Sequence, residues 1–346
     1  MTKVRKLLLY RLLLLITAVL LLTTLVPKVY SAESTPGSGI TVGPPVVEYT
    51  IEKGQTASGI VKVNDYNPAA VTLYPQVSDF ASKDETGQPA FFEPDPNRKF
   101  SLSNWIKFSP EPINLAVGEL RAVQYQIVVP ADAEPGGHYG VLFFSTKAPN
   151  DVKEGEAKVS TNLKVGQLIL VKVPGNIAEK GSVASFKTKK YFNFMPEIHL
   201  WKTNETTDDQ GKKTSKKEWN PSFAWNVGFT TRIQNNGNIH FKPKGDIQVK
   251  NILGQRVSTQ TVNPENGNVL PESIRLFENK WTPAWWQFGY FKGNLNLTYG
   301  LNQSLTASAG FLVIPWWLIV VVILLIVLIA VVIRKKKKKR LKKQSS

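Results

Sequence analysis

The sequence predicts an all-β protein with two immunoglobulin-like β-sandwich domains and one C-terminal transmembrane helix. Apolar and polar residues alternate through much of residues 40–308, as in GIVKVND at residues 59–65. Clusters of Gly, Pro, Asn and Asp interrupt the alternation at short intervals, and almost no stretch has helical periodicity. This pattern is typical of sandwich strands joined by turns. A single run of 23 uncharged residues near the C-terminus accounts for the predicted helix.

Residues 1–31 are predicted to be a secretory signal peptide. Three basic side chains within the first six residues precede a long apolar stretch, and the small residue Ser31 suits a cleavage site. Arg11 interrupts the apolar stretch, so an uncleaved signal anchor is the alternative. Residues 32–39 are rich in Ser and Gly and form the predicted linker.

Residues 40–175 are predicted to form the first sandwich. Strands are expected near residues 40–51, 56–64 and 70–80, and alternation resumes after a long irregular segment at residues 83–111. A connection of this length inside a compact domain is usually either functional or a disordered insertion. The sequence leaves both interpretations open.

Residues 181–308 are predicted to form a second, smaller sandwich that is rich in asparagine, with a polar loop at residues 204–220. Asn-Gly at 236–237 and Lys-Gly at 244–245 each suit a tight turn in which glycine takes a positive φ. Asn235 and Asn238 are expected to bond nearby backbone groups. Turns that set strand register are the structural interpretation, and a polar ligand loop is the functional one.

Residues 311–333 are predicted to form the transmembrane helix. At 1.5 Å per residue the run is about 35 Å long, enough for a hydrocarbon core of roughly 30 Å. Pro315 is tolerated because it falls in the first turn of the helix. Trp316 and Trp317 are the predicted membrane-interface residues, because amphipathic rings favour that region.

Most of the net charge of +17 lies outside the predicted domains. The tail at residues 334–346 holds nine basic side chains and residues 1–31 hold five, which leaves +3 for the rest. Positive charge remains on the cytoplasmic side of a membrane, so a basic cytoplasmic tail and an extracellular ectodomain are expected, as in a single-pass type I protein. A nearly neutral ectodomain disfavours nucleic-acid binding. The absence of cysteine favours a bacterial cell surface.

No motif in the sequence indicates catalysis. The histidines His138, His199 and His240 are far apart, and neither a G-x-S-x-G elbow nor a phosphate-binding glycine loop occurs. No catalytic, cofactor-binding or metal-binding residues are therefore predicted, and the protein is expected not to be an enzyme. Acids at residues 84–87 and 93–97 could together offer oxygen ligands to calcium, although solvated loop acids are the simpler interpretation.

Aromatic residues in two segments are the predicted contacts for a partner or a glycan. The candidates are Phe91, Phe92, Trp105, Trp285 and Trp286. Exposed rings would stack on sugars or meet a partner, whereas buried rings would belong to the core. Alternation predicts that about half of the rings in the second segment face outward.

The order of parts and three segments resemble the WxL-interacting proteins of Gram-positive bacteria. ITVGPPVVEYTIEKGQTASGIVKVND at residues 40–65 is similar to that family's opening strands, and PADAEPGGHYGVLFF at 130–144 to its glycine turn and central strand. FTTRIQNNGNIHFKPKGDIQVKNILGQ at 229–255 resembles a strand pair common in bacterial surface domains. The resemblance implies a first domain that contacts peptidoglycan and WxL-type proteins, and a second that contacts host or other proteins. The 83–111 segment and the Trp-rich end of the second domain depart from the family pattern.

These observations predict a non-catalytic, membrane-anchored bacterial cell-surface protein. It would engage cell-wall polymer or other surface proteins through sandwich edges and loops. One alternative is a PapD-like assembly chaperone, which would present a free sheet edge to a partner strand. Another is a calcium- or carboxylate-dependent envelope enzyme or transporter accessory. The ligand, the oligomeric state and the rigidity between the two domains stay open.

Overall fold

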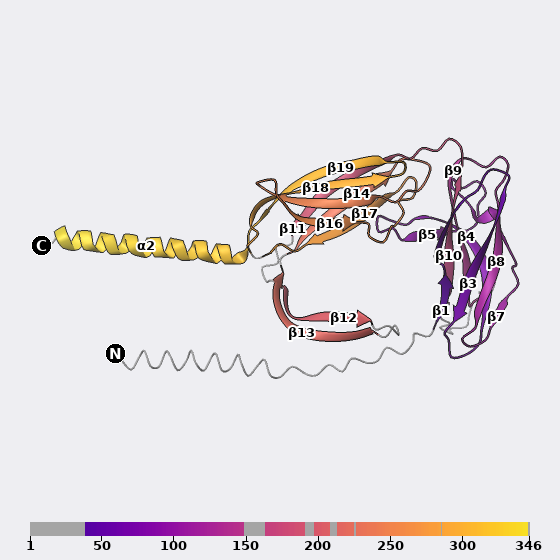
Figure 1. Ribbon diagram of the computed structural model, residues 1–346, viewed down its shortest axis with the longest axis horizontal. Coiled ribbons are helices and arrows are strands. Elements are labelled where there is room, and N and C mark those ends of the chain that lie inside the picture. Colours follow the sequence, from indigo (N-terminus) through magenta and orange to yellow (C-terminus); the bar gives the residue numbers. More distant parts are fainter. Residues whose placement is uncertain are drawn as a thin grey trace, which may run out of the picture.

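The computed structural model describes residues 39–148, 163–190, 197–207, 213–224, 226–284 and 286–344. It contains two β-sandwiches, a separate two-stranded hairpin and a C-terminal helix (Figure 1). The prediction of a mostly β protein with two immunoglobulin-like sandwiches is confirmed. The predicted signal peptide and nearly all of the predicted linker lie outside the described residues.

The first sandwich packs a four-stranded sheet against a larger one. The smaller sheet has the order β1-β3-β8-β6, and its strands are Ile40–Gly43 (β1), Thr56–Asp65 (β3), Leu120–Val128 (β8) and Ile106–Phe108 (β6). The larger sheet has the order β2-β10-β9-β4-β5, with β7 also paired to β4. Its strands are Val46–Thr50 (β2), Val71–Ser82 (β4), Pro89–Phe92 (β5), Ile113–Leu115 (β7), Gly136–Ser145 (β9) and Lys164–Val173 (β10).

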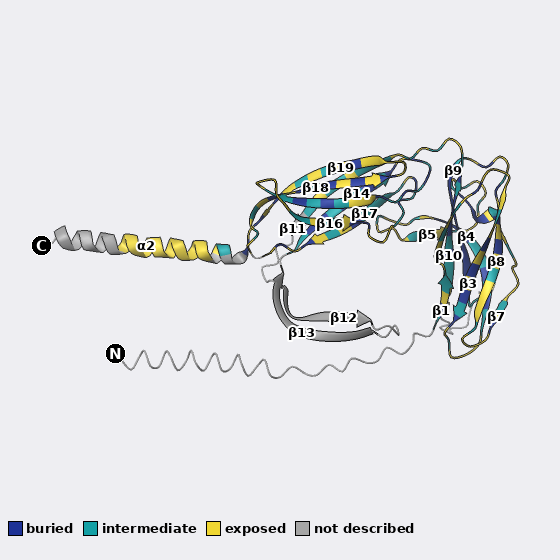
Figure 2. Ribbon diagram, viewed as in Figure 1, coloured by how far each residue is buried: buried dark blue, intermediate teal, exposed yellow. Residues whose placement is uncertain are grey.

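Strand β9 is buried along its whole length because both faces of its sheet are covered (Figure 2). Side chains on one face, such as Leu142 and Phe144, fill the core between the sheets. Side chains on the other face form a second apolar cluster, made of Phe80, Tyr139, Val141, Phe143 and Leu170. Leu270 of the second sandwich packs against this cluster. The outer face of the larger sheet therefore serves as the contact surface between the two sandwiches.

The second sandwich has a three-stranded and a four-stranded sheet. The first has the order β11-β14-β17, with strands Gly181–Lys190 (β11), Val227–Asn235 (β14) and Ile274–Trp281 (β17). The second has the order β16-β15-β18-β19, with strands Arg256–Val262 (β16), Lys244–Asn251 (β15), Gly289–Tyr299 (β18) and Gln303–Val313 (β19). The core between them is rich in aromatic rings, among them Phe229, Trp281, Phe291 and Phe311.

The polar loop predicted at residues 204–220 is wrong. Strands β12 (Glu197–Thr207) and β13 (Lys213–Ala224) form an antiparallel hairpin there. The strands pair through backbone hydrogen bonds, which any residue type except proline supplies in full, so polar side chains do not prevent the pairing.

Gly237 lacks the predicted positive φ, whereas Gly245 has it (+148°) but lies within a strand and not in a turn. Gly237 has no positive φ, but a Cβ there would lie 1.9 Å from the carbonyl oxygen of Ala178. Gly245 lies within β15, where a Cβ would lie 2.0 Å from the carbonyl oxygen of Asn296. Close approach of another backbone, rather than a turn, therefore requires glycine at both positions.

The predicted bond to a nearby backbone group is confirmed for Asn235, whereas Asn238 bonds to backbone groups that are distant in sequence. Asn235 is fully buried and donates from Nδ2 to the carbonyls of Ile239 (2.7 Å) and Val269 (2.9 Å). Asn238 donates to the carbonyl of Pro135, in the first sandwich, at 3.1 Å. The segment predicted to be a register-setting turn therefore also joins the two sandwiches.

Helix α2 spans Trp316–Gln344 and leaves the second sandwich at its far end (Figure 1). It begins five residues later than predicted, because Phe311 and Val313 are buried in the core as the last residues of β19. The segment predicted as a basic tail continues the helix to residue 344. Within the described part of the chain, no helix has the length and apolar character needed to cross a membrane. The prediction of a transmembrane helix at residues 311–333 is therefore not confirmed.

Candidate functional site

The two sandwiches are joined directly by hydrogen bonds between strand β9 and the segment that follows β14. Gly137 donates its N–H to the carbonyl of Asn238 at 2.8 Å. Two residues further along β9, the hydroxyl of Tyr139 contacts both the backbone N–H and the ring of His240. These contacts lie next to a space between the two sandwiches. They hold the sandwiches at a fixed separation on either side of that space.

The segment at residues 83–111 braces the second sandwich. Glu85 accepts from the N–H of Leu276 at 2.7 Å through its carbonyl and pairs with Arg232 at 2.5 Å through its carboxylate. Lys99 forms a further ion pair with Glu272. Of the two interpretations left open by the sequence, a disordered insertion is wrong, because the segment contains β5, β6 and the 3-10 turn η1 (Ser103–Trp105).

Buried Asp79 on β4 fixes the base of this segment. Its Oδ1 accepts from the N–H groups of Leu102 (3.0 Å) and Ser103 (2.8 Å), and its Oδ2 accepts from the hydroxyl of Ser101 (2.8 Å). A carboxylate with three donors can remain inside the protein without a cation beside it. The acid therefore ties the long connection to the sheet that it crosses.

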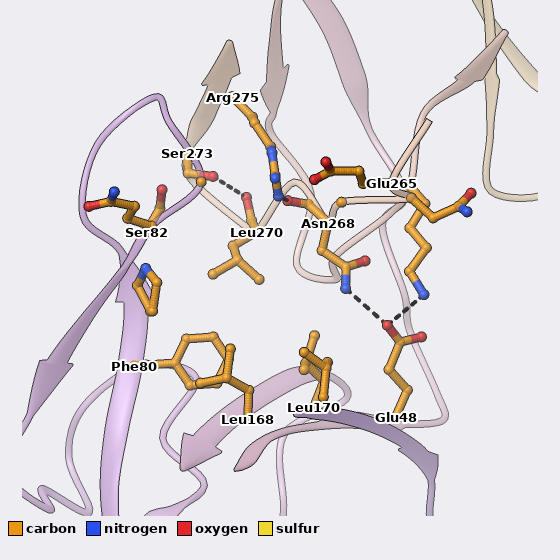
Figure 3. Close-up of a pocket in the computed structure, with 17 residues that line it drawn as sticks. Glu48, Phe80, Ser82, Leu168, Leu170, Glu265, Asn268, Leu270, Ser273 and Arg275 are labelled. Atoms are coloured by element: carbon orange, nitrogen blue, oxygen red, sulfur yellow. Dashed lines mark hydrogen bonds and ion pairs between the residues drawn. The ribbon is translucent and has the colours of Figure 1, made fainter. Parts of the chain in front are cut away.

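A groove with a volume of about 530 Å³ lies between the sandwiches. Its floor is the outer face of the larger sheet of the first sandwich, where Phe80, Leu168 and Leu170 present apolar surface (Figure 3). The opposite wall is the connection between β16 and β17, which contributes Asn268 and Leu270. One wall is therefore mainly apolar, and the other combines polar and apolar groups.

Glu48 on β2 bridges the two sandwiches at one end of this groove. One of its carboxylate oxygens accepts from Lys242 Nζ at 2.7 Å and from Asn268 Nδ2 at 2.9 Å. Burial alone would raise the pKa of Glu48, but the hydrogen bonds from Lys242 and Asn268, together with the charge of Lys242, lower it below the ordinary value. Glu48 therefore carries a negative charge that the second sandwich neutralises.

A second hollow, with a volume of about 560 Å³, lies on the other side of Glu48. It is lined by Tyr49 and Thr50 from β2 and by His240 and Tyr299 from the second sandwich. The two hollows share Glu48, Lys242 and Asn268 as a common boundary. Strand β2 thus runs past both hollows, with the Glu48 bridge between them.

Arg275 on β17 is a cation of the first hollow, and the charge of Glu265 in the same hollow partly offsets the effect of burial on its pKa. It donates from Nη1 to the carbonyl of Asn268 at 2.7 Å, and it forms no ion pair with any described residue. Burial lowers the pKa of its guanidinium. Next to it, the side-chain oxygen of Asn268 is buried without a hydrogen-bond partner in the described part of the chain. An anionic group in the groove would pair with the Arg275 guanidinium, and an N–H group would donate to the free oxygen of Asn268.

The edge of β2 that faces the groove is open. Strand β2 runs parallel to β10, and in a parallel ladder alternate residues bond to the neighbouring strand. The carbonyl of Pro45 accepts from β10 at 2.8 Å and the N–H of Ile51 donates to β10 at 3.0 Å, so the odd-numbered residues face β10. The backbone groups of Val46, Glu48 and Thr50 therefore point away from the sheet, and no other described segment bonds to them.

The predicted aromatic contacts are scattered rather than gathered in one site. Trp105 is half-buried against the first core and lies with its ring 4.3 Å from that of His138. Phe91 is exposed and stands edge-on to Phe143, whereas Phe92 is half-buried under the guanidinium of Arg98. None of these three lines either hollow between the sandwiches.

The remaining predicted residues lie at or beyond the far end of the second sandwich. Trp286 is exposed in the connection between β17 and β18. Trp285 lies outside the described residues, and nothing is described of the side chains of Trp316 and Trp317 at the start of α2.

The two acidic segments considered for calcium form local turns. Asp84 accepts from the N–H and hydroxyl of Thr86, and Asp95 accepts from the N–H of Asn97 at 2.9 Å. The residues that the structure describes contain no group of three or more acids and histidines placed to hold a metal ion.

Sequence reasoning missed the residues of the groove. Glu48 and Asn268 are 220 positions apart, and their bond depends on how the sandwiches dock. Lys242 lies in the connection between β14 and β15 and Arg275 lies in β17, and their neighbours in sequence do not distinguish them from other surface cations. The run NPENGN at residues 263–268 is the one local sequence signal of the groove wall. Asparagine tolerates a positive φ, and two asparagines of the run adopt one.

No protein-family model matches the chain, and no curated protein matches it in sequence. Several solved structures resemble its fold at low sequence identity. A chain from a chaperone–tip adhesin complex of CFA/I fimbriae biogenesis is 13% identical, with a TM-score of 0.36, over 78% of this chain and 98% of that one. The Escherichia coli chaperone DraB is 9% identical, with a TM-score of 0.32, over 80% of this chain and 98% of that one. A PapD-like domain of human CEP192 is 10% identical, with a TM-score of 0.27, over 43% of this chain and 95% of that one. These values describe a likeness of fold and say nothing about what this chain binds.

Proposed function

We propose that this chain is a non-catalytic binding protein of the bacterial cell surface, which takes an extended segment of a partner protein as an added strand on β2, in the manner of an assembly chaperone. The observation that carries the proposal is the open edge of β2 beside the groove between the sandwiches. A segment added there would bond to the outward backbone groups of Val46, Glu48 and Thr50 and place alternate side chains towards the hollows.

The composition of β2 supports binding at this edge. Exposed sheet edges are usually protected by charge, proline or short length. Strand β2 has a single charged residue, Glu48, whose charge is taken up by Lys242. Val46, in the wall of the first hollow, keeps 43% of its surface exposed. The edge is therefore open, apolar at one end and free of unpaired charge.

The groove suggests which side chains a partner would carry. An apolar side chain would remove the surfaces of Phe80 and Leu168 from water, and an acidic one would meet Arg275. Burying one such apolar side chain contributes roughly 1.5–3 kcal/mol. An extended segment with an apolar and an acidic residue two positions apart, both on the face towards the groove, is the ligand of best fit.

Localisation and partner class are part of this proposal and rest on the sequence. The uncharged residues 316–333 followed by the basic residues 334–343 support attachment to a membrane with the tail inside. The resemblance to WxL-interacting proteins favours a WxL-type or other surface protein as the partner, and peptidoglycan as a further ligand. Fractionation of cells that express the tagged full chain, followed by protease treatment of intact cells, tests the location.

Proline substitution tests strand addition directly. Val46→Pro removes an outward N–H without removing a bond to β10, and Val46→Ala is the matched control that keeps the N–H. Each full-length variant is used to select from a displayed library of short peptides and is incubated with purified peptidoglycan. Strand addition predicts that peptides selected by the wild type bind Val46→Ala and fail to bind Val46→Pro, while the melting temperatures of the two variants agree.

Equal peptide binding by Val46→Pro and Val46→Ala would show that the β2 edge is not used. Binding to peptidoglycan without any peptide binding would favour the cell-wall function expected from the sequence. The two outcomes separate a protein ligand from a polymer ligand.

A further inference from the structure

The end of the second sandwich from which α2 leaves has a rim of exposed apolar side chains. The rim consists of Ile252, Leu253, Trp286, Phe288, Tyr290, Leu312 and Ile314, with exposed fractions between 39% and 77%. They come from the turn between β15 and β16, the connection between β17 and β18, and the ends of β18 and β19. A contiguous apolar surface of this kind usually marks an interaction site.

Strand register places these segments at one end of the sandwich. Asn251, at the end of β15, pairs with Phe291, and Gly289 pairs with Val313 at the end of β19. The ring of Trp281, which ends β17, lies 5.2 Å from that of Phe291. The connection that carries Trp286 therefore begins at the same end as the β15–β16 turn, next to the start of α2 (Figure 1).

The segments that carry the rim have only positive charges. The segments 250–256, 280–292 and 310–319 contain the basic residues Lys250, Arg256, Lys280 and Lys292 and no Asp or Glu. Lys250 and Lys292 are direct partners in the β15–β18 ladder. Like charges directly opposite each other destabilise a sheet, so an external negative charge would relieve this repulsion.

We propose that this end of the second sandwich docks onto an anionic lipid surface. The rim side chains enter the boundary between headgroups and acyl chains, where Trp and Tyr are favoured, and the lysines meet the lipid phosphates. The chain continues from the rim into α2 without a charged residue from 311 to 333. The described side chains of α2 between Val321 and Ile333 are exposed as well, so more exposed apolar surface follows the rim along the chain.

Docking through this end would set the orientation of the whole protein. Helix α2 leaves the second sandwich on the side away from the first sandwich (Figure 1). A lipid surface at the rim therefore leaves the groove beside β2 facing solvent. This inference is independent of what the groove binds.

The absence of cysteine allows a clean test by labelling. Leu253→Cys in the rim and Leu301→Cys in the turn at the opposite end of the same sandwich place single thiols at highly exposed positions, 76% and 90% for the native leucines. Each full-length variant carries an environment-sensitive fluorophore and is added to vesicles of phosphatidylglycerol and phosphatidylcholine. Iodide quenches labels in water, and lipids spin-labelled on the acyl chain quench labels in the membrane.

The proposal predicts that the label at 253 is quenched several-fold more by spin-labelled lipid, and several-fold less by iodide, than the label at 301. Replacing both Lys250 and Lys292 by Gln should reduce the lipid quenching at 253. Equal iodide quenching at the two positions, or a failure of the chain to bind the vesicles, would overturn the inference. If the label at 253 becomes better protected from iodide as more protein is added to the same amount of lipid, a second copy of the protein covers the rim. That result would also overturn the inference.

Discussion

The hydroxyl oxygen of Tyr139 accepts a hydrogen bond from the backbone N–H of His240 at 3.0 Å and lies 3.1 Å from Nδ1 of the same residue. The hydroxyl can donate its one proton to this ring nitrogen, an arrangement that requires a neutral imidazole with its proton on the other nitrogen. Tyr139 belongs to the first sandwich and His240 to the second. The protonation state of one histidine is therefore coupled to the contact between the sandwiches.

Stability should fall as the pH is lowered through the range set by His240. Burial lowers its pKa from 6.5 to about 4, with Glu48 opposing the shift and Lys242 and Lys172 adding to it. Between these values the unfolded chain binds a proton that the folded chain does not, so the free energy of unfolding decreases as the pH falls from 6.5 towards 4. Chemical denaturation at a series of pH values measures this slope.

His240→Asn is the control for that experiment, because the amide can place an acceptor near the Tyr139 hydroxyl and does not titrate. Above pH 5, the free energy of unfolding of the variant should lack the pH dependence that the wild type shows. The same slope in both proteins would assign the pH dependence to other groups.

Asp79→Ala should destabilise the first sandwich by about 3 kcal/mol or more, since it leaves three buried donors without an acceptor. Asp79→Asn should cost less, because the amide oxygen can still accept from the N–H groups of Leu102 and Ser103. Urea denaturation ranks the two variants, and limited proteolysis of the 83–111 segment reports local release. Equal stability of the two would show that the bonds to Asp79 contribute little.

Asn235→Asp should be less stable than Asn235→Ala at neutral pH. The aspartate would direct an oxygen at the carbonyls of Ile239 and Val269, which accept from the native amide. Burial without donors raises the pKa of such a carboxyl group, and its protonated form can donate again. The difference between the variants should therefore shrink as the pH is lowered, and a difference that does not change with pH would contradict this account.

Gly237→Ala should cost more than about 2 kcal/mol, because the added methyl group meets the carbonyl of Ala178 and the backbone must shift. Gly254→Ala is the comparison, since its φ is +79° but the space around it is open. Adopting that conformation with alanine costs roughly 1–2 kcal/mol. Thermal unfolding measures both, and a milder effect at 237 than at 254 would show that the contact at Ala178 relaxes easily.

The sequence by itself determined the class of the fold and several local details. Alternation in GIVKVND indicates a half-buried strand, because the side-chain period of a strand is two. The bond of Asn235 to the carbonyl of Ile239 followed from the short reach of the asparagine side chain, whereas the bond of Asn238 to Pro135 did not. The start of α2 did not follow, because Phe311 and Val313 are equally apolar in a strand core and in a helix.

Only the tertiary structure decided where binding residues meet. Glu48 bonds to Lys242 and Asn268 because the outer face of one sheet docks against the loops of the other sandwich. The rim at the far end likewise joins Leu253, Trp286 and Leu312 from separate segments. Periodicity reports which face of its own strand a residue occupies. Periodicity does not show which distant segment will contact that residue, because the contact depends on the packing of whole sheets.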